Sequence, residues 1–246
     1  MVVGRHAHGV ITLLVATGQL VAGADIELAQ DEAHHLRVRR AAMDETVRLV
    51  DGAGAVASAS LRAAGKEIHA VVAAVELVAR GPTITLGVAA GDKERFGFMV
   101  EKATELGATR IVPVVTEHSA AVASRIRSAQ LPKLQRRALE AIKQCGAAWA
   151  PEIAEPMSLF HFATAPWTGA RWLADAAGVI PTGLPDDGAL TIAVGPEGGF
   201  TFEERDTLID SRFVPVRLGP HILRFETAAI AALAAVWQLY PRAKND

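Results

Sequence analysis

Strand-like and helix-like segments alternate from residue 83 to the end of the chain, and this alternation restricts the possible folds more than any other feature of the sequence. The apolar run "TITLGVAA" precedes a helical pattern that continues through "FMVEKATELG". The run "RIVPVVTE" precedes a helix expected from about Leu131 to Gln144, which Gly146 would end. Strands that alternate with helices form a mostly parallel sheet with helices on both faces, so we expect an α/β domain over residues 81–246.

The alternation continues in the last third of the chain. "RWLADA" and "LTIAV" are strand-like, a helix is expected from Thr201, and "FVPVRL" is strand-like again. The last helix is expected from about Glu226. Because this helix is rich in alanine on all sides, we expect other backbone to surround it closely.

Residues 1–80 follow a different pattern, in which short apolar runs are separated by turn signals. Examples are "GQLVAGADIELAQ", "TVRLVDGAGAVASASL" and "HAVVAAVELVA". The segment "DGAG" from Asp51 marks a tight turn between two strands, because glycine tolerates positive φ. This pattern is typical of a small β-barrel or sandwich. We place the domain boundary near Gly81, which begins a Gly-Pro pair.

The composition excludes several classes of protein. The chain has 246 residues, of which 50% are hydrophobic, and a formal net charge of −2. A uniformly basic nucleic-acid-binding surface is therefore excluded, and only local basic patches remain. The single cysteine, Cys145, excludes an internal disulfide and a cysteine-held metal cluster, and it fits a reducing cytoplasm. No apolar stretch is long and uninterrupted enough to span a membrane, so we expect no membrane partner. We also expect a cytoplasmic protein that binds no metal.

The glycine-rich segment "GPEGGF" from Gly195 lies between the strand-like run "LTIAV" and the helix expected from Thr201. Thr201 and Glu204 have the spacing of a capping box, in which a hydroxyl and a carboxylate accept hydrogen bonds at the start of a helix. The loop therefore lies at the carboxyl end of a strand, where open α/β sheets bind ligands. It matches neither G-x-G-x-x-G nor G-K-[ST], so a phosphate site is not indicated, and a plain tight turn is the alternative.

A second loop follows the next strand, in "LGPHILRFETAAIAALAAV". The strand is expected to end at Leu218, and Gly219-Pro220 makes a turn before the last helix. Glu226 in the first turn of that helix complements the helix dipole and is interpreted either as a cap or as a site residue. Both loops lie at the same end of the sheet, so they are placed to line one pocket.

Basic residues are concentrated in two segments. Six of them lie between Val122 and Lys143, against the single acid Glu140. Such a run is usually the solvated surface of a helix, but beside an RNA site it would contact phosphates. The second segment, "HHLRVRR", contains the adjacent His34 and His35, which on a strand would point to opposite faces and so would not share a metal.

Four separated motifs, in matching order from about residue 10 to residue 240, together resemble those of the ribosomal RNA small subunit methyltransferase E family. They are "HHLRVRR", "VEKATELGATRIVP", "VGPEGGF" and "LGPHILRFETA". The resemblance implies methylation of N3 of a uridine in 16S ribosomal RNA, with S-adenosylmethionine as the methyl donor. It also implies a trefoil-knotted SPOUT-type domain over residues 81–246, a PUA-like β-barrel for RNA binding over residues 1–80, and a homodimer that acts on ribosomal RNA or the small ribosomal subunit.

The resemblance assigns the two loops to S-adenosylmethionine. The residues expected to bind it are Val194, Gly195, Glu197, Gly198, Gly199, Leu218, Gly219, Ile222 and Leu223. Because N3 of uracil must lose a proton before it attacks, a cation that stabilises negative charge on the adjacent carbonyl oxygens favours the reaction. Arg224 is the candidate for this catalytic role, and Glu226 is the candidate that orients Arg224 or accepts the proton. The alternative is a structural ion pair between Arg224 and Glu226.

The two basic segments are expected to bind RNA. The expected RNA-binding residues are Arg37, Arg39, Arg40, Arg125, Arg127, Lys133, Arg136 and Arg137. The homodimer interface is expected around the last helix, with Leu233 and Trp237 as anchors, because large apolar side chains dominate interface energetics. Two alternatives remain for the function: a methyltransferase for another RNA site, and a non-catalytic RNA-binding assembly factor that keeps the fold.

Overall fold

The computed structural model describes residues 10–89, 92–120, 126–184 and 188–240. The chain divides into two compact units. The first comprises Met1–Arg80 and Leu139–Ala150, and the second comprises Gly81–Ala138 and Pro151–Asp246. Residues Leu139–Ala150, which the sequence predicts as part of the α/β domain, belong to the first unit instead. In the part of the chain that the structure describes, no helix is long and apolar enough to cross a membrane.

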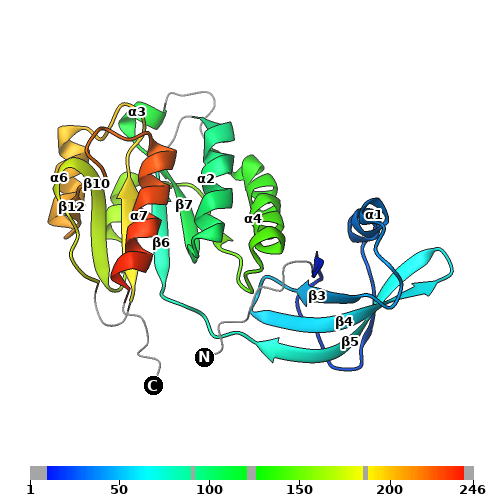
Figure 1. Ribbon diagram of the computed structural model, residues 1–246. Coiled ribbons are helices and arrows are strands. Elements are labelled where there is room, and N and C mark those ends of the chain that lie inside the picture. The colour runs from blue at the N-terminus through cyan, green and yellow to red at the C-terminus, as the bar shows by residue number, and fades with distance from the viewer. Residues whose placement is uncertain (1–9, 90–91, 121–125, 185–187, 241–246) are drawn as a thin grey trace, which may run out of the picture. The chain divides into compact units, whose positions relative to one another are not determined.

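The sheet of the first unit has five strands: β1 (Thr12–Leu14), β2 (Asp25–Glu27), β3 (Thr46–Val50), β4 (Ala55–Ala64) and β5 (Glu67–Leu77). Figure 1 shows β3, β4 and β5 side by side. The order of the five strands is β1-β3-β4-β5-β2. β1 pairs in parallel with β3, and the other neighbours pair antiparallel. Alternate residues point to the two faces of a strand, which is why Val47 and Leu49 are both fully buried on one face of β3.

The turn between β3 and β4 is the tight turn that the sequence predicts. Gly52 and Gly54 have φ values of 69° and 101°, which favour glycine over other residues. Asp51 stabilises the turn, because its Oδ1 accepts hydrogen bonds from the backbone N–H groups of Ala53 and Ala55 at 2.8 and 3.0 Å. The local sequence was therefore sufficient to predict this connection.

The segment that contains His34 and His35 is a helix, α1 (Gln30–Arg39), so the expectation of a strand there is wrong. Ala33 and Leu36 are buried and three positions apart, which is the spacing of one helix face. The sequence argument that opposite strand faces separate the two histidines does not apply. His34 is exposed and His35 is half-buried on successive positions of the helix.

A buried ion pair joins α1 to the end of α4 (Leu131–Cys145) within the first unit. Lys143 Nζ donates a hydrogen bond to Glu32 Oε1 at 2.7 Å, and the two side chains are 12% and 6% exposed. Burial by itself would lower the pKa of Lys143, but the hydrogen bond and negative charge of Glu32 outweigh burial and raise this pKa above its ordinary value. Lys143 therefore remains a cation inside this unit.

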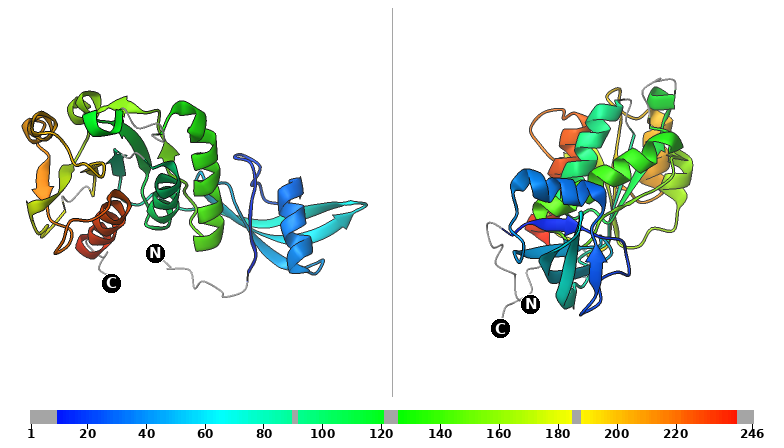
Figure 2. Two further views of the ribbon diagram at one scale, coloured as in Figure 1. Left: turned by 90° about the horizontal axis from the view of Figure 1, so that it is seen from above. Right: turned by 90° about the vertical axis from the view of Figure 1, so that its right-hand side faces the viewer.

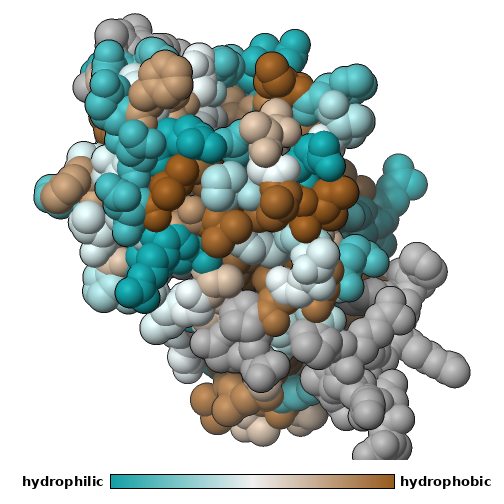
Figure 3. All heavy atoms as spheres, turned by 90° about the vertical axis from the view of Figure 1, so that its left-hand side faces the viewer, coloured by the Kyte–Doolittle hydropathy of each residue, from teal (hydrophilic) through white to brown (hydrophobic). Residues whose placement is uncertain are grey.

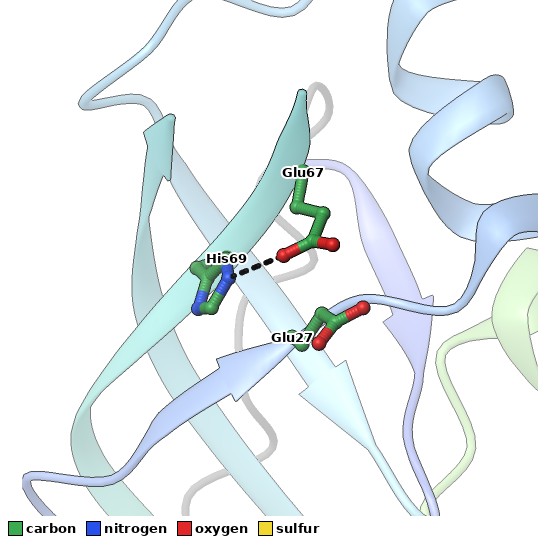
Figure 4. A group of neighbouring side chains, drawn as sticks. All are labelled: Glu27, Glu67 and His69. Atoms are coloured by element: carbon green, nitrogen blue, oxygen red, sulfur yellow. Dashed lines mark ion pairs between the residues drawn. The ribbon is translucent and has the colours of Figure 1, made fainter. Parts of the chain in front are cut away.

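Polar side chains gather on one face of the first sheet, where Figure 4 shows Glu27, Glu67 and His69 side by side. Glu27 and His69 are directly opposite each other on β2 and β5. The Nε2 of His69 lies 3.8 Å from Glu67 Oε2, and its Nδ1 lies 3.1 Å from Asp25 Oδ1. Asp25 also pairs with Arg62 on β4. We interpret the group as a cross-strand network of polar side chains that holds β2, β4 and β5 together.

The second unit contains a seven-stranded sheet. Its strands are β6 (Ile84–Val88), β7 (Arg110–Val115), β8 (Glu152–Ile153), β9 (Met157–Ser158), β10 (Ala170–Val179), β11 (Leu190–Val194) and β12 (Val214–Val216). The order is β12-β10-β11-β6-β7-β8, and β9 pairs with β7. All of these pairings are parallel, as the alternation of strands and helices predicts.

Helices cover both faces of this sheet. They are α2 (Lys93–Glu105), α3 (Glu117–Ala120), the first part of α4, α5 (Leu159–Thr164), α6 (Phe202–Asp210) and α7 (Phe225–Leu239), with a short 3₁₀ turn η1 (Ser128–Gln130). Ile192 on β11 packs in a core cluster with residues of α2 and α7, whereas its neighbour Ala193 packs in a cluster with α5 and α6. The view from above in Figure 2 shows α2 and α7 on the same side of the sheet.

One irregularity in this sheet brings two segments of backbone unusually close. The pairing of β10 with β12 shifts after Ala174, and Val179 then pairs with Val216. Between these pairs, the backbone of Gly178 lies so close to that of Pro215 and Val216 that any Cβ at Gly178 would overlap them. Glycine is therefore required where β10 packs against β12 after the register shift.

The structure corrects one expected interface residue on α7. Leu233 is fully buried in the core of the second unit, so the expectation that it anchors a dimer is wrong. Trp237 is 41% exposed, and its Nε1–H donates to the carbonyl oxygen of Leu106 at 2.6 Å. Figure 3 views the second unit from the side of β10, β12 and α6, where apolar patches lie among polar ones. Val214 on β12 is one exposed apolar residue of this unit, at 52%.

Candidate active site

The glycine-rich loop connects the end of β11 to α6. Gly199 has a φ of 73°, and Thr201 caps the helix that follows. The backbone N–H of Glu204 donates to Thr201 Oγ1 at 3.2 Å, and the N–H of Thr201 donates to Glu204 Oε2 at 3.0 Å. The predicted capping box is confirmed, and it fixes the loop at the carboxyl end of β11.

Helix α3 supports the same loop from the neighbouring strand β7, a contact that the sequence analysis did not predict. The backbone N–H of Glu117 donates to Glu204 Oε1 at 2.8 Å. His118 Nδ1 donates to the carbonyl oxygen of Gly199 at 2.9 Å. A Cβ at Gly198 would lie 3.1 Å from the ring of His118. A side chain at Gly198 would therefore require the ring of His118 to shift.

A cavity of about 460 Å³ lies beside this loop and the loop that follows β12. Its lining includes all nine residues expected to bind a cofactor: Val194, Gly195, Glu197, Gly198, Gly199, Leu218, Gly219, Ile222 and Leu223. Lining residues that the sequence analysis missed include Leu173, Asp175, Arg205, Val216, His221 and Phe225. The volume lies within the range that small-molecule sites occupy, which is about 300 to 1,000 Å³.

The cavity wall combines apolar side chains with glycine backbone. Val194 and Phe225 are buried, and Leu218 is partly buried against the same core. Gly195 and Gly198 expose backbone groups where a side chain would fill the space. Apolar walls suit the faces of a flat heterocycle, and backbone N–H and C=O groups suit its polar edge. The wall therefore fits a nucleoside-type cofactor better than a phosphate.

Two pairs of opposite charges lie at this cavity. Arg205 Nε donates to Asp175 Oδ2 at 3.0 Å, and both residues line the cavity. Glu197 Oε1 lies 3.9 Å from Nη1 of Arg95, at the start of α2. The charges come from β10, the glycine-rich loop, α6 and α2, so the fold alone brings them together.

The two expected catalytic residues begin α7, and neither lines the cavity. Arg224 is the N-cap residue, is exposed and makes no side-chain capping bond. Glu226 is 9% exposed, and its Oε2 has no hydrogen-bond partner among the described residues. No ion pair joins Arg224 to Glu226 in the described part of the chain, so the structural ion pair that was the alternative is absent. Phe225, which lies between them, lines the cavity.

The basic residues of the 122–143 segment have different surroundings, and Arg125 lies outside the described residues. Arg127 and Arg136 are exposed. Lys133 is 75% exposed and lies 3.5 Å from Glu94. Arg137 is more enclosed, because its guanidinium covers Gly97 on α2 and its Nε lies 4.0 Å from Glu101.

In the first unit, the basic residues expected to bind RNA are exposed at the end of α1. Arg37 Nη2 donates to the carbonyl oxygen of Lys66 at 3.0 Å, which ties that side chain to the turn before β5. Arg39 is the last residue of the helix, and Arg40 follows it with a left-handed φ of 54°. These cations are therefore available to an anionic partner.

The sequence matches known proteins over most of its length. The family model described as an RNA methyltransferase domain matches residues 79–237, and the one described as an RNA methyltransferase PUA domain matches residues 28–72. The ribosomal RNA small subunit methyltransferase E of Synechocystis is 30% identical over 239 residues, which cover 91% of this chain and 76% of that protein. The chain belongs to the ribosomal RNA small subunit methyltransferase E family. The member from Rickettsia conorii is 28% identical, covering 89% of this chain and 91% of that protein.

Two solved structures have the same fold. The enzyme of Neisseria gonorrhoeae, crystallised with S-adenosylmethionine, matches with a TM-score of 0.83 and 26% identity over 94% of this chain and 98% of that one. A methyltransferase of Legionella pneumophila in complex with the same cofactor matches with a TM-score of 0.78 and 29% identity over 93% and 97% of the two chains. The predicted SPOUT-type α/β fold with a separate PUA-like N-terminal sheet unit is confirmed.

Proposed function

We propose that this protein methylates N3 of a uridine in the RNA of the small ribosomal subunit, with S-adenosylmethionine as its cofactor. The observation that carries the proposal is the cavity beside the loops after β11 and β12, whose lining includes the whole motif "GPEGG" and every residue of "LGPHIL" except Pro220. The names of the relatives and their cofactor-bound structures support an S-adenosylmethionine-dependent ribosomal RNA methyltransferase. That the methyl group goes to N3 of uracil is a more specific proposal than these names support.

In this proposal, the cavity residues hold the cofactor and exclude water from the reaction. Val194, Leu218 and Leu223 would contact the faces of the adenine, and the backbone at Gly195 and Gly198 would reach its polar edge. When bound, S-adenosylmethionine supplies an activated methyl group for an in-line displacement. The contribution of the protein is alignment of this group with the nucleophilic nitrogen, which accounts for much of the rate in reactions of this kind.

In this proposal, Arg224 would stabilise negative charge on the target base, and Glu226 would accept its proton. Arg224 is exposed beside the cavity residue Leu223 and has no partner among the described residues, so its guanidinium is available to stabilise negative charge on a uracil carbonyl oxygen. Glu226 has a buried oxygen without a hydrogen-bond partner in the first turn of α7. We assign Glu226 as the acceptor of the N3 proton.

Two measurements test the proposal. Calorimetry is expected to show binding of S-adenosylmethionine and of its demethylated product, with much weaker binding of ATP. Mapping of N3-methyluridine in ribosomal RNA is expected to show one site that is unmodified in a deletion strain and restored by the wild-type gene but not by Arg224→Ala. Tight binding of ATP with no response to S-adenosylmethionine would contradict the cofactor assignment.

The same mapping separates the alternatives. Methylation that disappears from a different RNA would identify a methyltransferase for another site. A deletion strain with normal methylation but defective subunit assembly would favour a non-catalytic assembly factor. The intact cofactor motifs argue against the second alternative.

We also propose a homodimer in the cytoplasm. The proposed interface surrounds α7 and the loop that leads into it, where Trp237 is 41% exposed and Ile222 is 90% exposed. Exposed large apolar side chains of this kind are typical anchors of protein interfaces. Analytical ultracentrifugation at the concentration of the methylation assay tests this proposal, and a fully active monomer would refute it.

A further inference from the structure

The cavity has an apolar interior and a charged edge. Val194 and Phe225 line it as buried side chains, each 2% exposed. Three charged lining residues are more accessible: the side chains of Asp175, Arg205 and Glu197 are 19%, 40% and 42% exposed. This gradient predicts that a ligand with one apolar and one charged end binds with its charged end at the edge. S-adenosylmethionine has these two ends, so this inference rests on the proposed function.

The Asp175 side chain is fixed at both of its oxygens. Oδ2 accepts the hydrogen bond from Arg205 Nε at 3.0 Å, and Oδ1 accepts one from the backbone N–H of Ala177 at 2.8 Å. The bond to Nε holds the guanidinium of Arg205 in one orientation. The two terminal Nη groups of Arg205 have no hydrogen-bond partner among the described residues. They remain available for a ligand.

Arg205 is the only arginine or lysine among the described residues that line this cavity. A planar guanidinium with two free N–H groups matches a carboxylate, which it binds through two parallel hydrogen bonds. The amino-acid end of S-adenosylmethionine carries a carboxylate, and the nucleoside end carries none. Glu197 would repel a carboxylate at its own part of the edge. We propose that Arg205 binds the carboxylate of the amino-acid end of the cofactor, and that Asp175 positions Arg205.

The two ends of the cofactor would contact different strands, helices and loops of the protein. The nucleoside end would contact the two loops at the ends of β11 and β12, whereas the amino-acid end would contact α6 and the middle of β10. A cofactor fragment without the amino-acid end would therefore keep all of its contacts with the loops. This separation makes the proposal testable with two ligands.

Calorimetry with S-adenosylhomocysteine and 5′-methylthioadenosine compares ligands with and without the amino-acid end. Arg205→Gln is expected to weaken S-adenosylhomocysteine binding by about tenfold or more, because hydrogen bonds to a charged group are lost. It is expected to leave the affinity for 5′-methylthioadenosine within about twofold, which also shows that the cavity is intact. Arg205→Lys keeps the charge without the planar fork and is expected to be intermediate.

Two further variants complete the test. Asp175→Asn is expected to weaken S-adenosylhomocysteine binding by a few-fold, since the amide holds the guanidinium less firmly. The matched control is Arg217→Gln, which removes an exposed arginine that follows β12 and does not line the cavity. It is expected to change neither affinity.

Three results would overturn the inference, and they differ from one another. Equal weakening of both ligands by Arg205→Gln would place Arg205 at the nucleoside end or in the support of the wall. Unchanged affinity for S-adenosylhomocysteine would remove Arg205 from recognition. A wild-type protein that binds neither ligand would refute the proposed function itself, independently of the role of Arg205.

Discussion

Replacing Lys143 by methionine is expected to destabilise the first unit by about 3 to 5 kcal/mol, the usual effect of removing one partner of a buried ion pair. The side chains of Lys143 and Glu32 are 12% and 6% exposed, so solvent screens their interaction little. The Nζ of Lys143 lies 2.7 Å from Glu32 Oε1, and Glu32 Oε2 has no partner among the described residues. The substitution would leave a buried carboxylate without a compensating cation.

Hydrogen exchange of the amides in α1 measures this effect as a local opening free energy, without requiring that the two units unfold in one step. The double variant Glu32→Leu/Lys143→Met is expected to recover most of the loss, because apolar side chains often replace a buried ion pair without cost. Arg62→Met is the matched control: Arg62 lies in the same unit and is 51% exposed beside Asp25, so we expect a change below about 1 kcal/mol. A Lys143→Met effect as small as that of Arg62→Met would refute the reasoning.

The pH dependence of the same pair has a definite sign. The pKa of Lys143 is raised above its ordinary value of 10.5 in the folded protein, because Glu32 outweighs the opposing effect of burial. The stability that this shift contributes is fully present below pH 10.5 and is lost as the pH rises through the folded-state pKa. The difference in urea midpoint between wild type and Lys143→Met is therefore expected to shrink above pH 10.5.

Three further predictions concern the site. Gly198→Val is expected to abolish S-adenosylmethionine binding in calorimetry, because its side chain would displace His118 and enter the cavity, whereas retained affinity would contradict this placement. Alanine at both Arg136 and Arg137 is expected to weaken RNA binding and lower its salt slope by about one to two, with unchanged cofactor affinity. Mixing Arg224→Ala and Gly198→Val subunits is expected to restore methylation if Arg224 serves the cofactor of the partner, and inactivity would place both roles in one subunit.

The sequence was sufficient to predict the longer alternating strands and helices of the second unit, because long apolar runs and strong helix signals agree with each other there. It did not predict the short elements β8, β9, α3 and α5. The capping box at Thr201 also follows from two residues three positions apart. The sequence-based prediction was wrong at α1, where only Ala33 and Leu36 give a helical spacing among short β-like runs. A short helix with so few apolar positions has a weak local signal, and its packing decides its conformation.

The candidate site was only partly predictable for a related reason. Its loops have a local signature, whereas Asp175 and Arg205 are 30 positions apart and meet only because the middle of β10 lies beside α6. Asp175 gave one usable signal, since it is an acid that directly follows an apolar strand-like run. Arg205 gave none. Whether Glu226 was buried also depended on how α7 packs, which its own segment does not reveal.

The close approach at Gly178 makes the cavity depend on the pairing of β10 with β12. Leu173 on β10 and Val216 on β12 both line the cavity. The cavity therefore requires these two strands to have paired, and a cofactor stabilises only the chain in which they have. Cofactor present during refolding is then expected to slow unfolding without speeding the steps that precede this pairing. A substitution at Gly178 would disturb the pairing, because any Cβ there would overlap the backbone of Pro215 and Val216.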